Sequence, residues 1–580
     1  MSVARRQGSS GAMHVVTNRV RHGEREYTST LLRRSYREGG KVRKETLANL
    51  SHLPPEVIEL IRGALRGQHY LPAGEAFQIE RSLPAGHVMA ALGMARRLDL
   101  ARLLDRKPSR ERDLCVAMIC ERVIAPASKL AGVRAFEQST LASELGVADA
   151  DEDDLYGALD WLVERQSRIE DRLAQRHFSD GELVLYDVSS SYFEGHACPL
   201  ARLGYSRDGK RGTPQVIYGL LCDKPGRPIA VEVFSGELHD DATLPAQITK
   251  LKERFHLKSV VVVCDRGMVT KANMQTLKDT EGVGWITALK APQIKKLART
   301  GELQLSLFDE QNLAEITAEE YPGERLIVCR NPLVAAERTR KRSELLAATE
   351  RELAQIAERV ERGTLKGADQ VGLAVGPAVK RYRMRKHFEL QITDASFTFH
   401  RKTEQIQTEA ALDGIYILRT SLTEGELQTG DVVRSYKNLE QAERAFKTFK
   451  GPELEIRPIH HHLAHRVRAH VLLCMLGYYL TWHLKQAWAP LIFKDENPPI
   501  TADPVAKATR STDAQRKAQT KRTTTGAPCH SYKSLLAELA TLTRNTIRLP
   551  DTPASFDKLS QPTDLQTHAL DLAEHAPLTT

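Results

Sequence analysis

The sequence lacks the features that mark secreted, zinc-binding or membrane-spanning proteins. None of its eight cysteines forms a Cys-x-x-Cys pair. Several lie in apolar runs, which is typical of buried thiols in a reducing compartment and argues against a structural zinc site. The first ten residues have no apolar core of the signal-peptide kind. The longest apolar run, residues 471–480, is about half a membrane span, so we expect a cytoplasmic protein with no membrane partner.

Size and charge favour a large globular protein with a polyanionic partner. The 580 residues include 83 Lys and Arg against 74 Asp and Glu, a formal net charge of +9. Lys and Arg displace counterions from phosphates, so this excess points to nucleic acid first, although it is weak evidence by itself. The chain has room for roughly two to four domains.

The first 180 residues predict a small β element and then helices. Two strand-like segments, 27–32 and 42–47, flank a Glu-Gly-Gly turn, and a Pro-Pro pair then opens a helix over 56–65. Apolar spacings of three and four predict helices at 114–123 and 155–162. This helical region is either a DNA-binding domain or a scaffold, and it shows no clear helix-turn-helix signature.

Between residues 181 and 290 the pattern changes to strands rich in Val and Ile. The five candidate strands are residues 183–187, 214–223, 229–236, 259–265 and 284–290. A Lys-Pro-Gly turn joins the second and third as an antiparallel hairpin. A helical stretch at 243–255 precedes the fourth, and a β-helix-β connection favours a parallel neighbour. This order is that of an RNase H-like core, an α/β fold with a mixed five-stranded sheet and helices.

Residues 291–410 interrupt that core, and residues 340–362 within them predict a helix with one packed stripe. The stripe consists of Leu346, Thr349, Leu353, Ile356 and Val360. Residues 413–420 then resemble a strand and residues 437–488 a long helical region. The rest is expected as a polar, loosely held linker at 489–530, a helix at 532–542 and a strand at 546–549.

Residues 379–388 alternate as a strand would, with three arginines on one face. Arg381, Arg383 and Arg385 occupy every second position. Three guanidiniums on one side of a ribbon suit a phosphate backbone, so these residues are candidate DNA contacts. An ordinary solvated edge strand is an equally good interpretation.

Two aspartates end predicted core strands. Asp187 closes the first strand and Asp265 closes the fourth. Such an aspartate places its carboxylate at the carboxyl edge of the sheet, where sites in α/β folds lie, or acts only as a turn residue that bonds its own backbone. Two carboxylates this close repel each other, and a hard divalent cation removes the conflict. Mg²⁺ or Mn²⁺ fits best.

A third group comes from Tyr436, Glu443 and Lys450, which are spaced seven and seven. On a helix each step of seven drifts only about 20°, so all three project from one face. A hydroxyl, a carboxylate and an ammonium in one stripe can serve a metal and its phosphate together. The alternative is a solvated helix face with incidental charge.

Together these motifs resemble the bacterial insertion-sequence transposases with an RNase H-like DDE core, specifically the group with a Tyr-x2-Arg-x3-Glu-x6-Lys signature. Tyr436, Glu443 and Lys450 keep the spacing, whereas Leu439 stands at the arginine position. Other stretches that resemble a subgroup of these enzymes are LVLYDVSSSYFEG (183–195), GYSRDGKRGTPQVIYGL (204–220), VVVCDRG (261–267), IHHHLAHRVRAHVLLCMLGYY (459–479) and YREGGKVRKETLANL (36–50).

The resemblance implies a function and a role for each residue of the signature. Asp187, Asp265 and Glu443 would be the catalytic ligands of Mg²⁺ or Mn²⁺, with two ions bound; Glu440, one turn from Glu443, is a rival. The implied activity is metal-dependent cleavage of transposon ends and strand transfer into target DNA. A structure-selective nuclease on the same core and a catalytically retired repressor are the alternatives.

The resemblance also implies the DNA contacts and the partners. Tyr436 and Lys450 would contact the transposon end, and Arg444 is a further candidate. The partners would be double-stranded DNA, as terminal inverted repeats and target, and a second copy in a synaptic homodimer associated with the nucleoid. The expected domains are an N-terminal hairpin and helix (1–70), a helical region (71–180), the first part of the catalytic core (181–290), a β-rich insertion (291–410), the second part of the core (411–488), and a linker with the C-terminal tail (489–580).

Two other features have a functional and a structural interpretation. Five histidines at 460, 461, 462, 465 and 470 invite a metal site, but no matching Cys or His cluster completes one, so packing and phosphate contact are favoured. Trp285 is able to stack on an extruded base, but packing in the core is the default for a tryptophan in an apolar strand.

Overall fold

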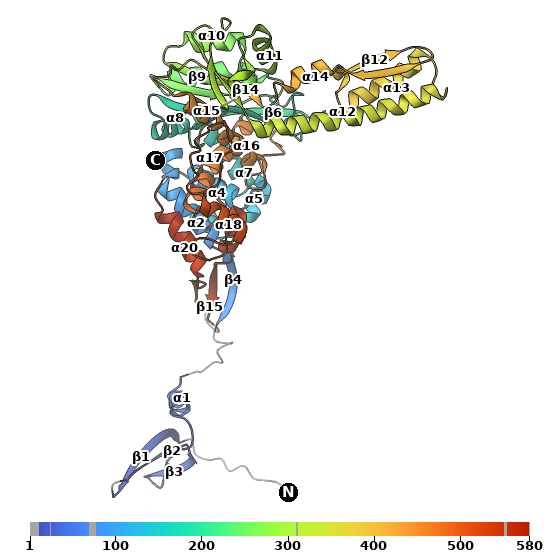
Figure 1. Cartoon of the computed structure of the whole chain (residues 1–580). Helices are drawn as coiled ribbons and strands as arrows, with labels where there is room; N and C mark the ends of the chain where they lie inside the picture. The colour runs from blue at the N-terminus through green and yellow to red at the C-terminus, as the bar shows by residue number, and fades with distance from the viewer. Residues whose placement is uncertain are drawn as a thin grey trace. The chain divides into compact units, whose positions relative to one another are not determined.

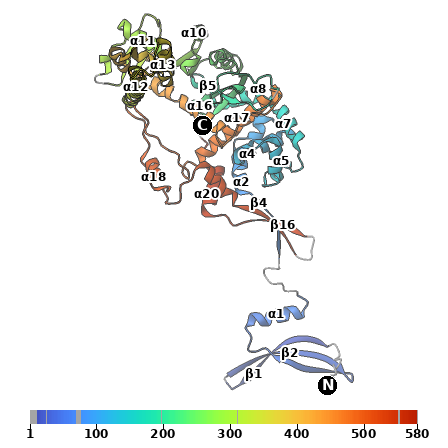
Figure 2. The ribbon, with the colours of Figure 1, turned by 90° about the vertical axis from the view of Figure 1, so that its right-hand side faces the viewer.

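The computed structural model describes residues 11–23, 25–68, 77–195, 197–308, 311–549 and 554–578. The first ten residues, where we expect no signal peptide, lie outside these ranges. The chain forms two compact units: residues 1–82 with 544–559, and residues 83–543 with 560–580. Each unit is described by itself (Figures 1 and 2).

The smaller unit begins with a three-stranded antiparallel sheet. Its strands are β1 (Ala12–His22), β2 (Arg25–Glu38) and β3 (Lys41–Asn49). Gly39 and Gly40 both have positive φ in the β2–β3 turn, as this tight connection requires. α1 (Pro55–Leu65) follows with a proline in its first turn. The predicted hairpin and helix are confirmed, and β1 is an additional strand.

A second small sheet corrects the expectation that residues 71–180 are wholly helical. β4 (Gln78–Pro84) pairs in the order β16–β15–β4 with β15 (Thr543–Arg548) and β16 (Ser555–Leu559). Its partners come from the other end of the chain, so no local pattern announces this strand. The predicted strand at 546–549 is confirmed as part of β15.

The larger unit is built on one mixed sheet that contains all five predicted core strands. They are β5 (Glu182–Tyr192), β6 (Gln215–Asp223), β7 (Pro228–Ser235), β8 (Val260–Cys264) and β9 (Val283–Ala288). The strands β5, β6 and β7 form an antiparallel meander, and β8 is parallel to β5 and to β9. The crossover to β8 runs through α9 (Leu244–Thr249) and a π turn, Lys250–Arg254. The predicted hairpin and parallel neighbour are confirmed.

The sheet has eight strands rather than the five expected. β10 (Leu313–Ile316), β11 (Arg325–Arg330) and β14 (Ile415–Thr420) extend it in the order β10–β11–β14–β9–β8–β5–β6–β7. Of these three, only β14 was predicted. β10 and β11 are short and come from the segment assigned to the insertion, although β11 buries its four central residues in the sheet.

Helices surround the sheet and form a shared core with it. The predicted helical region contains α2 (Gly86–Arg97), α4 (Arg110–Ile124), α5 (Lys129–Phe136), α7 (Glu152–Glu164) and α8 (Gln166–His177). α17 (Ala464–Ala487) is buried on all sides from Ala469 to Leu484 and packs against α4, α7 and β7. A helix that is buried all round must lie inside its domain, so α17 joins the helical region to the sheet.

The long helical region predicted at 437–488 consists of two helices separated by a loop, and a further helix precedes it. α15 (Thr429–Lys437) ends before Asn438, α16 (Leu439–Lys450) follows, and residues 451–463 separate it from α17. This loop contains Pro452 and Pro458, which do not continue a helix. The apolar period alone did not reveal these breaks.

The insertion is dominated by helices, so the expected β-rich character is wrong. It contains α11 (Ala291–Thr300), α12 (Pro332–Glu361), α13 (Ala368–Arg381), β12 (Phe388–Ile392), β13 (Phe397–Arg401) and α14 (Thr403–Ala410). The predicted stripe is confirmed: Leu346, Thr349, Leu353, Ile356 and Val360 are the buried residues of α12. They pack with α13 and the β12–β13 hairpin in a core of their own, beside the sheet (Figure 1).

The three arginines at 381–385 do not share the face of a strand. Arg381 ends α13 and forms a salt bridge with Glu352, Arg383 has a positive φ of 56°, and Arg385 lies in a 3₁₀ turn. The alternation at 379–388 arises from a helix end and a turn, and the strand begins only at Phe388. The predicted ribbon of three guanidiniums is therefore wrong.

The segment 489–530 is more ordered than the loosely held linker that its composition predicts. It contains α18 (Thr512–Thr520), whose Lys517 is buried and donates hydrogen bonds to the Ala489 carbonyl (2.7 Å) and to Glu496 (2.6 Å). Polar contacts, which carry no apolar period, hold this segment. The predicted helix at 532–542 is confirmed as α19 (Tyr532–Ala540), and α20 (Asp564–His575) packs against α2.

The remaining compositional expectations concern thiols and membranes. All eight cysteines are free, and seven of them are buried. Within the described ranges, no helix combines the length and the apolar character that a membrane crossing requires.

Candidate active site

Asp187 lies within β5, not at its end as predicted. The strand continues through the buried Ser189, Ser190 and Ser191 to Tyr192, so the polar run was misread as a turn. The backbone N–H of Val188 donates to Oδ1 of Asp187 (2.8 Å). The pKa of the Asp187 carboxyl is raised to about 7, mainly by burial and in smaller part by the nearby negative charges of Asp265 and Glu443.

Asp265 follows β8 and lies next to Asp187 across the sheet. The parallel register pairs Tyr186 with Cys264, so the next position on each strand is one of the two aspartates. Asp265 caps the 3₁₀ turn Arg266–Met268 and accepts a hydrogen bond from the Gly267 N–H (3.3 Å). The prediction that these two aspartates are neighbours is confirmed.

Glu443 comes from α16, which packs against β5. The helix turns Ala442, Ala445, Phe446 and Phe449 into the core and leaves Glu443 exposed. Its rival Glu440 instead forms an exposed salt bridge with Arg444 (2.9 Å). Glu443 therefore faces the aspartates, whereas Glu440 does not line their cavity.

The three carboxylates line one cavity of about 580 Å³. They form no salt bridge within the part of the chain that the structure describes. The three carboxyl groups are too far apart to share one metal ion, since among the described residues no three His, Cys, Asp or Glu side chains lie close enough to do so. The other residues that line the cavity include Arg207, Asp208, Leu439, Lys447, Lys450 and Arg457.

Tyr436 and Glu443 do not share one helix, because α15 ends between them. Burial raises the pKa of the Tyr436 hydroxyl, and among nearby charges Asp265 contributes most to that rise. The tyrosine thus lies on α15 within the electrostatic influence of Asp265, but it is not among the residues that line the carboxylate cavity. The predicted stripe of three is wrong as a single helix face, although Lys450 lines the cavity from the last position of α16.

The sequence interpretation missed a cluster of ionised side chains at the cavity wall. Asp208, whose side chain is 1% exposed, forms salt bridges with Lys450 and Arg457 and accepts a hydrogen bond from the Tyr192 N–H (3.1 Å). Arg207 lies beside it and pairs with Asp240. The sequence of residues 204–220 resembles that of a transposase subgroup, but neither its charge spacing nor its strand pattern indicates that Asp208 is buried.

Comparison with known families shows to which family the chain belongs. Residues 179–480, more than half of the chain, match the family described as Transposase DDE domain. The chain belongs to the DDE transposases. Residues 14–74 match the family described as IS1634 family transposase, N-terminal domain. The protein is therefore a DNA transposase of an insertion sequence, an enzyme that acts on DNA.

Other comparisons add little to this assignment. A solved piggyBac transposase synaptic complex with hairpin DNA is similar at a TM-score of 0.33 and 9% identity, over 78% of this chain and 76% of that one. The search of curated proteins found no match. Transposase DDE domains generally depend on divalent metal ions.

Several residues that were considered for function in this transposase lie outside the carboxylate cavity. Arg444 is exposed and paired with Glu440. Trp285 is 4% exposed in a core cluster, as expected from the default interpretation. His465 contacts Asp160 (3.1 Å) and His470 contacts the Ile456 carbonyl (3.0 Å). Packing and ion pairing account for these two histidines.

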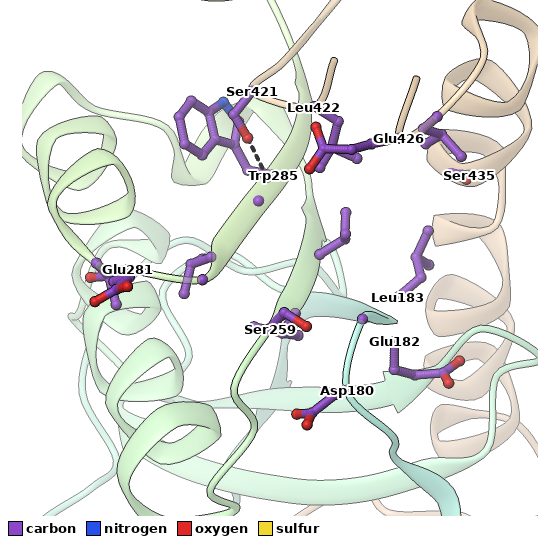
Figure 3. Close-up of a pocket in the computed structure, with 18 of the residues that line it drawn as sticks. Asp180, Glu182, Leu183, Ser259, Glu281, Trp285, Ser421, Leu422, Glu426 and Ser435 are labelled. Atoms are coloured by element: carbon purple, nitrogen blue, oxygen red, sulfur yellow. Dashed lines mark hydrogen bonds between the residues drawn. The ribbon is translucent and has the colours of Figure 1, made fainter. Parts of the chain in front are cut away.

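A larger cavity lies at the opposite edge of the sheet of the transposase, about 890 Å³ in volume. It is lined where β5, β8 and β9 begin, and Figure 3 shows Glu182, Ser259 and Trp285 around it. The backbone N–H of Trp285 donates there to Ser421 (3.1 Å). The largest cavity therefore lies at the other edge of the sheet from the three carboxylates.

Proposed function

We propose that this transposase cuts the ends of its element and joins them to target DNA at the cavity of Asp187, Asp265 and Glu443. One observation carries the proposal: three carboxylates, distant in the chain, line one cavity with no salt-bridge partner among the described residues. Such a concentration of negative charge needs a cation before a DNA phosphate can approach.

Asp187, Asp265 and Glu443 would hold two divalent cations, Mg²⁺ or Mn²⁺. Carboxylate oxygens are the ligands that these hard ions prefer. The pKa of Asp187 is raised mainly by burial, and the negative charges of Asp265 and Glu443 contribute to the rise. To share an ion, the three groups must move closer together than they lie in the open arrangement. When bound, a pair of such ions supplies Lewis acids on both sides of a phosphodiester during in-line displacement.

The surrounding side chains would orient the DNA. Lys450 and Arg457 lie at the cavity wall and can bind phosphate oxygens, while salt bridges with Asp208 hold these two side chains in place. The Tyr436 hydroxyl would contact the transposon end from the side of Asp265. Arg444, exposed on α16, is a candidate for a more distant phosphate contact. Because water and a DNA 3′-hydroxyl are the nucleophiles, we assign no covalent role to a serine or tyrosine.

The strand order supports an RNase H-like catalytic core. The order β7–β6–β5–β8–β9 combines an antiparallel meander with two parallel strands, and β14, β11 and β10 extend the sheet. We retain 181–290 and 411–488 as the two parts of this core, with the intervening segment contributing the edge strand β10 and its neighbour β11. We also propose that two copies bind paired inverted repeats in a synaptic homodimer within the nucleoid.

Labelled terminal inverted repeats test the proposal. With Mg²⁺, the purified protein should nick these ends in preference to unrelated DNA and join them to a target duplex. Cleavage without preference or joining would instead indicate a structure-selective nuclease. Metal-independent binding without cleavage would indicate a retired repressor.

A further inference from the structure

A second cavity, of about 570 Å³, lies beside the carboxylate cavity. Arg457 lines both cavities. The other basic residues that line the second cavity are Arg122, Lys129 and Arg466, together with His460, His461, His462 and His470.

The loop that lines this second cavity pairs with the residues that follow β5, the strand of Asp187. Phe193, directly after β5, forms a parallel bridge with Ile459. The Glu194 N–H donates to the Ile459 carbonyl (2.9 Å), and Nδ1 of His460 lies 3.1 Å from the Glu194 carbonyl. A DNA strand that leaves the carboxylate cavity past Arg457 would therefore next contact the residues that line the second cavity.

Lys129 is the unusual residue of the second cavity. It is 7% exposed, and among the described residues its ammonium has neither a hydrogen bond nor a salt bridge. It occupies the first position of α5, where Ser128 caps the Ala131 N–H and the helix dipole favours an anion. A buried, unpaired ammonium is costly unless an anion compensates it.

The neighbours of Lys129 compensate its charge only in part. Glu121 is buried near it and its negative charge favours the ammonium, but the two groups form no salt bridge, and burial raises the pKa of Glu121 and lowers that of Lys129. Arg122 is occupied by the carbonyls of Ala127 (2.8 Å) and Leu454 (3.4 Å), and Arg466 by Asp160 (2.9 Å). Lys129 thus remains available to a ligand.

The charge of the lining selects the class of ligand. Four cations, Arg122, Lys129, Arg457 and Arg466, line the cavity together with one carboxylate, Glu455. Asp208 pairs with Arg457 and Asp160 pairs with Arg466. Burial lowers the pKa of His461 to about 3, so this ring adds no charge near neutral pH but presents a polar edge. The lining therefore favours an anion, with Lys129 as the cation that has no salt-bridge partner among the described residues.

We propose that this cavity binds a phosphate of the DNA backbone close to the scissile phosphodiester, with Lys129 as its principal contact. The inference rests on the proposed function, because the DNA must pass the carboxylate cavity. Free inorganic phosphate offers the same chemistry, and the experiment must separate the two sources.

A methylphosphonate scan of the transposon end tests the proposal. Each duplex replaces one charged phosphate by a neutral one, and binding is measured with wild type, Lys129→Met and Lys258→Met. Lys258 is exposed at the opposite edge of the sheet and serves as the matched control. A methylphosphonate at one position should weaken the binding of wild-type protein about tenfold. Lys129→Met should bind the all-phosphate duplex weaker by the same factor, and the methylphosphonate at that position should not weaken its binding further. Its salt slope should fall by about 0.9.

Absence of any position coupled to Lys129 would overturn the proposal, even if cleavage still requires Asp187. The same holds if Lys129→Met changes only the binding of inorganic phosphate. By contrast, an Asp187→Asn variant that still cleaves would contradict the proposed function itself. Lys129→Met should melt no lower than wild type, because it removes an unpaired buried charge. If this variant fails to fold, acetylation of Lys129 in the wild-type protein can be measured by mass spectrometry instead. The all-phosphate duplex should block this acetylation, and the duplex with a methylphosphonate at the coupled position should restore it. Equal blocking by every duplex would overturn the proposal.

Discussion

The ammonium of Lys450 lies 2.9 Å from Oδ1 of Asp208, a side chain that is only 1% exposed. The same carboxylate pairs with Arg457, so one buried anion holds two cations at the wall of the carboxylate cavity. Asp208 comes from the loop between β5 and β6, whereas Lys450 ends α16. This ion cluster therefore ties the helix of Glu443 to the strand of Asp187.

Asp208→Asn should reduce both stability and cleavage. Removal of one partner from a buried ion pair leaves uncompensated charge and costs about 3–5 kcal/mol. Lys450 and Arg457 would then lose their fixed positions, so cleavage of the transposon end should fall more than the fraction of folded protein does. Urea unfolding and single-turnover cleavage measure the two effects.

Asp431→Asn is the control for this variant, because Asp431 and Arg434 form an exposed salt bridge (2.9 Å). Exposed pairs of this kind contribute about 1 kcal/mol or less. Equal effects of the two substitutions would show that Asp208 has no special role.

Leu439→Arg, which restores the signature arginine, should destabilise the protein. Leu439 is 7% exposed and belongs to the main apolar core at the cavity wall. Loss of its buried side chain costs about 1.5–3 kcal/mol, so the thermal midpoint should fall without a gain in cleavage. Leu439→Met, which conserves volume, should cost less than about 1.5 kcal/mol. Faster cleavage by the arginine variant would contradict this account.

The sequence predicted those elements whose signal is local. The β-branched runs between residues 181 and 290 marked five strands, and the apolar period marked the buried stripe of α12. The alternation of Arg381, Arg383 and Arg385 was misleading, because a helix end and a turn produce the same spacing as a strand. Partners far along the chain, such as those of β4, leave no local signal.

The candidate site was predictable only where its residues carry a local signal in the sequence. Asp187 and Asp265 stood out as polar residues on apolar strands, and their proximity followed from topology. Glu443 was chosen over Glu440 by family spacing, and only the packing of α16 distinguishes which one faces the cavity. Asp208 and Lys129 are recognisable only from their surroundings, since burial and missing partners are properties of the folded chain.

The buried histidines should make stability depend on pH. Nε2 of His177 lies 2.9 Å from the Tyr479 hydroxyl, and His483 packs against the same ring. Burial lowers the pKa of each histidine to about 3, below the value of 6.5 for an unfolded chain. Their stabilising contribution is therefore present above about pH 6.5 and is lost as the pH falls toward 3. At about pH 5 each should lose about 2 kcal/mol.

His483→Phe tests this dependence. Nε2 of His483 has no hydrogen-bond partner in the structure as described, so phenylalanine should preserve stability at about pH 7.5. The decrease in unfolding free energy toward about pH 5 should shrink by about 2 kcal/mol. Exposed His568→Gln should leave the pH profile as in the wild type. An unchanged profile in His483→Phe would show that this residue titrates normally in the folded protein.

The central claim is that Asp187, Asp265 and Glu443 act together on the DNA, and single-turnover cleavage of a labelled transposon end tests it most directly. Asp187→Asn, Asp265→Asn and Glu443→Gln should each slow cleavage at least about a thousandfold, or about 4 kcal/mol, while DNA binding persists. Glu440→Gln, one turn away on the same helix, should cleave at the wild-type rate. Full activity of Glu443→Gln, or an equal loss in Glu440→Gln, would contradict the account.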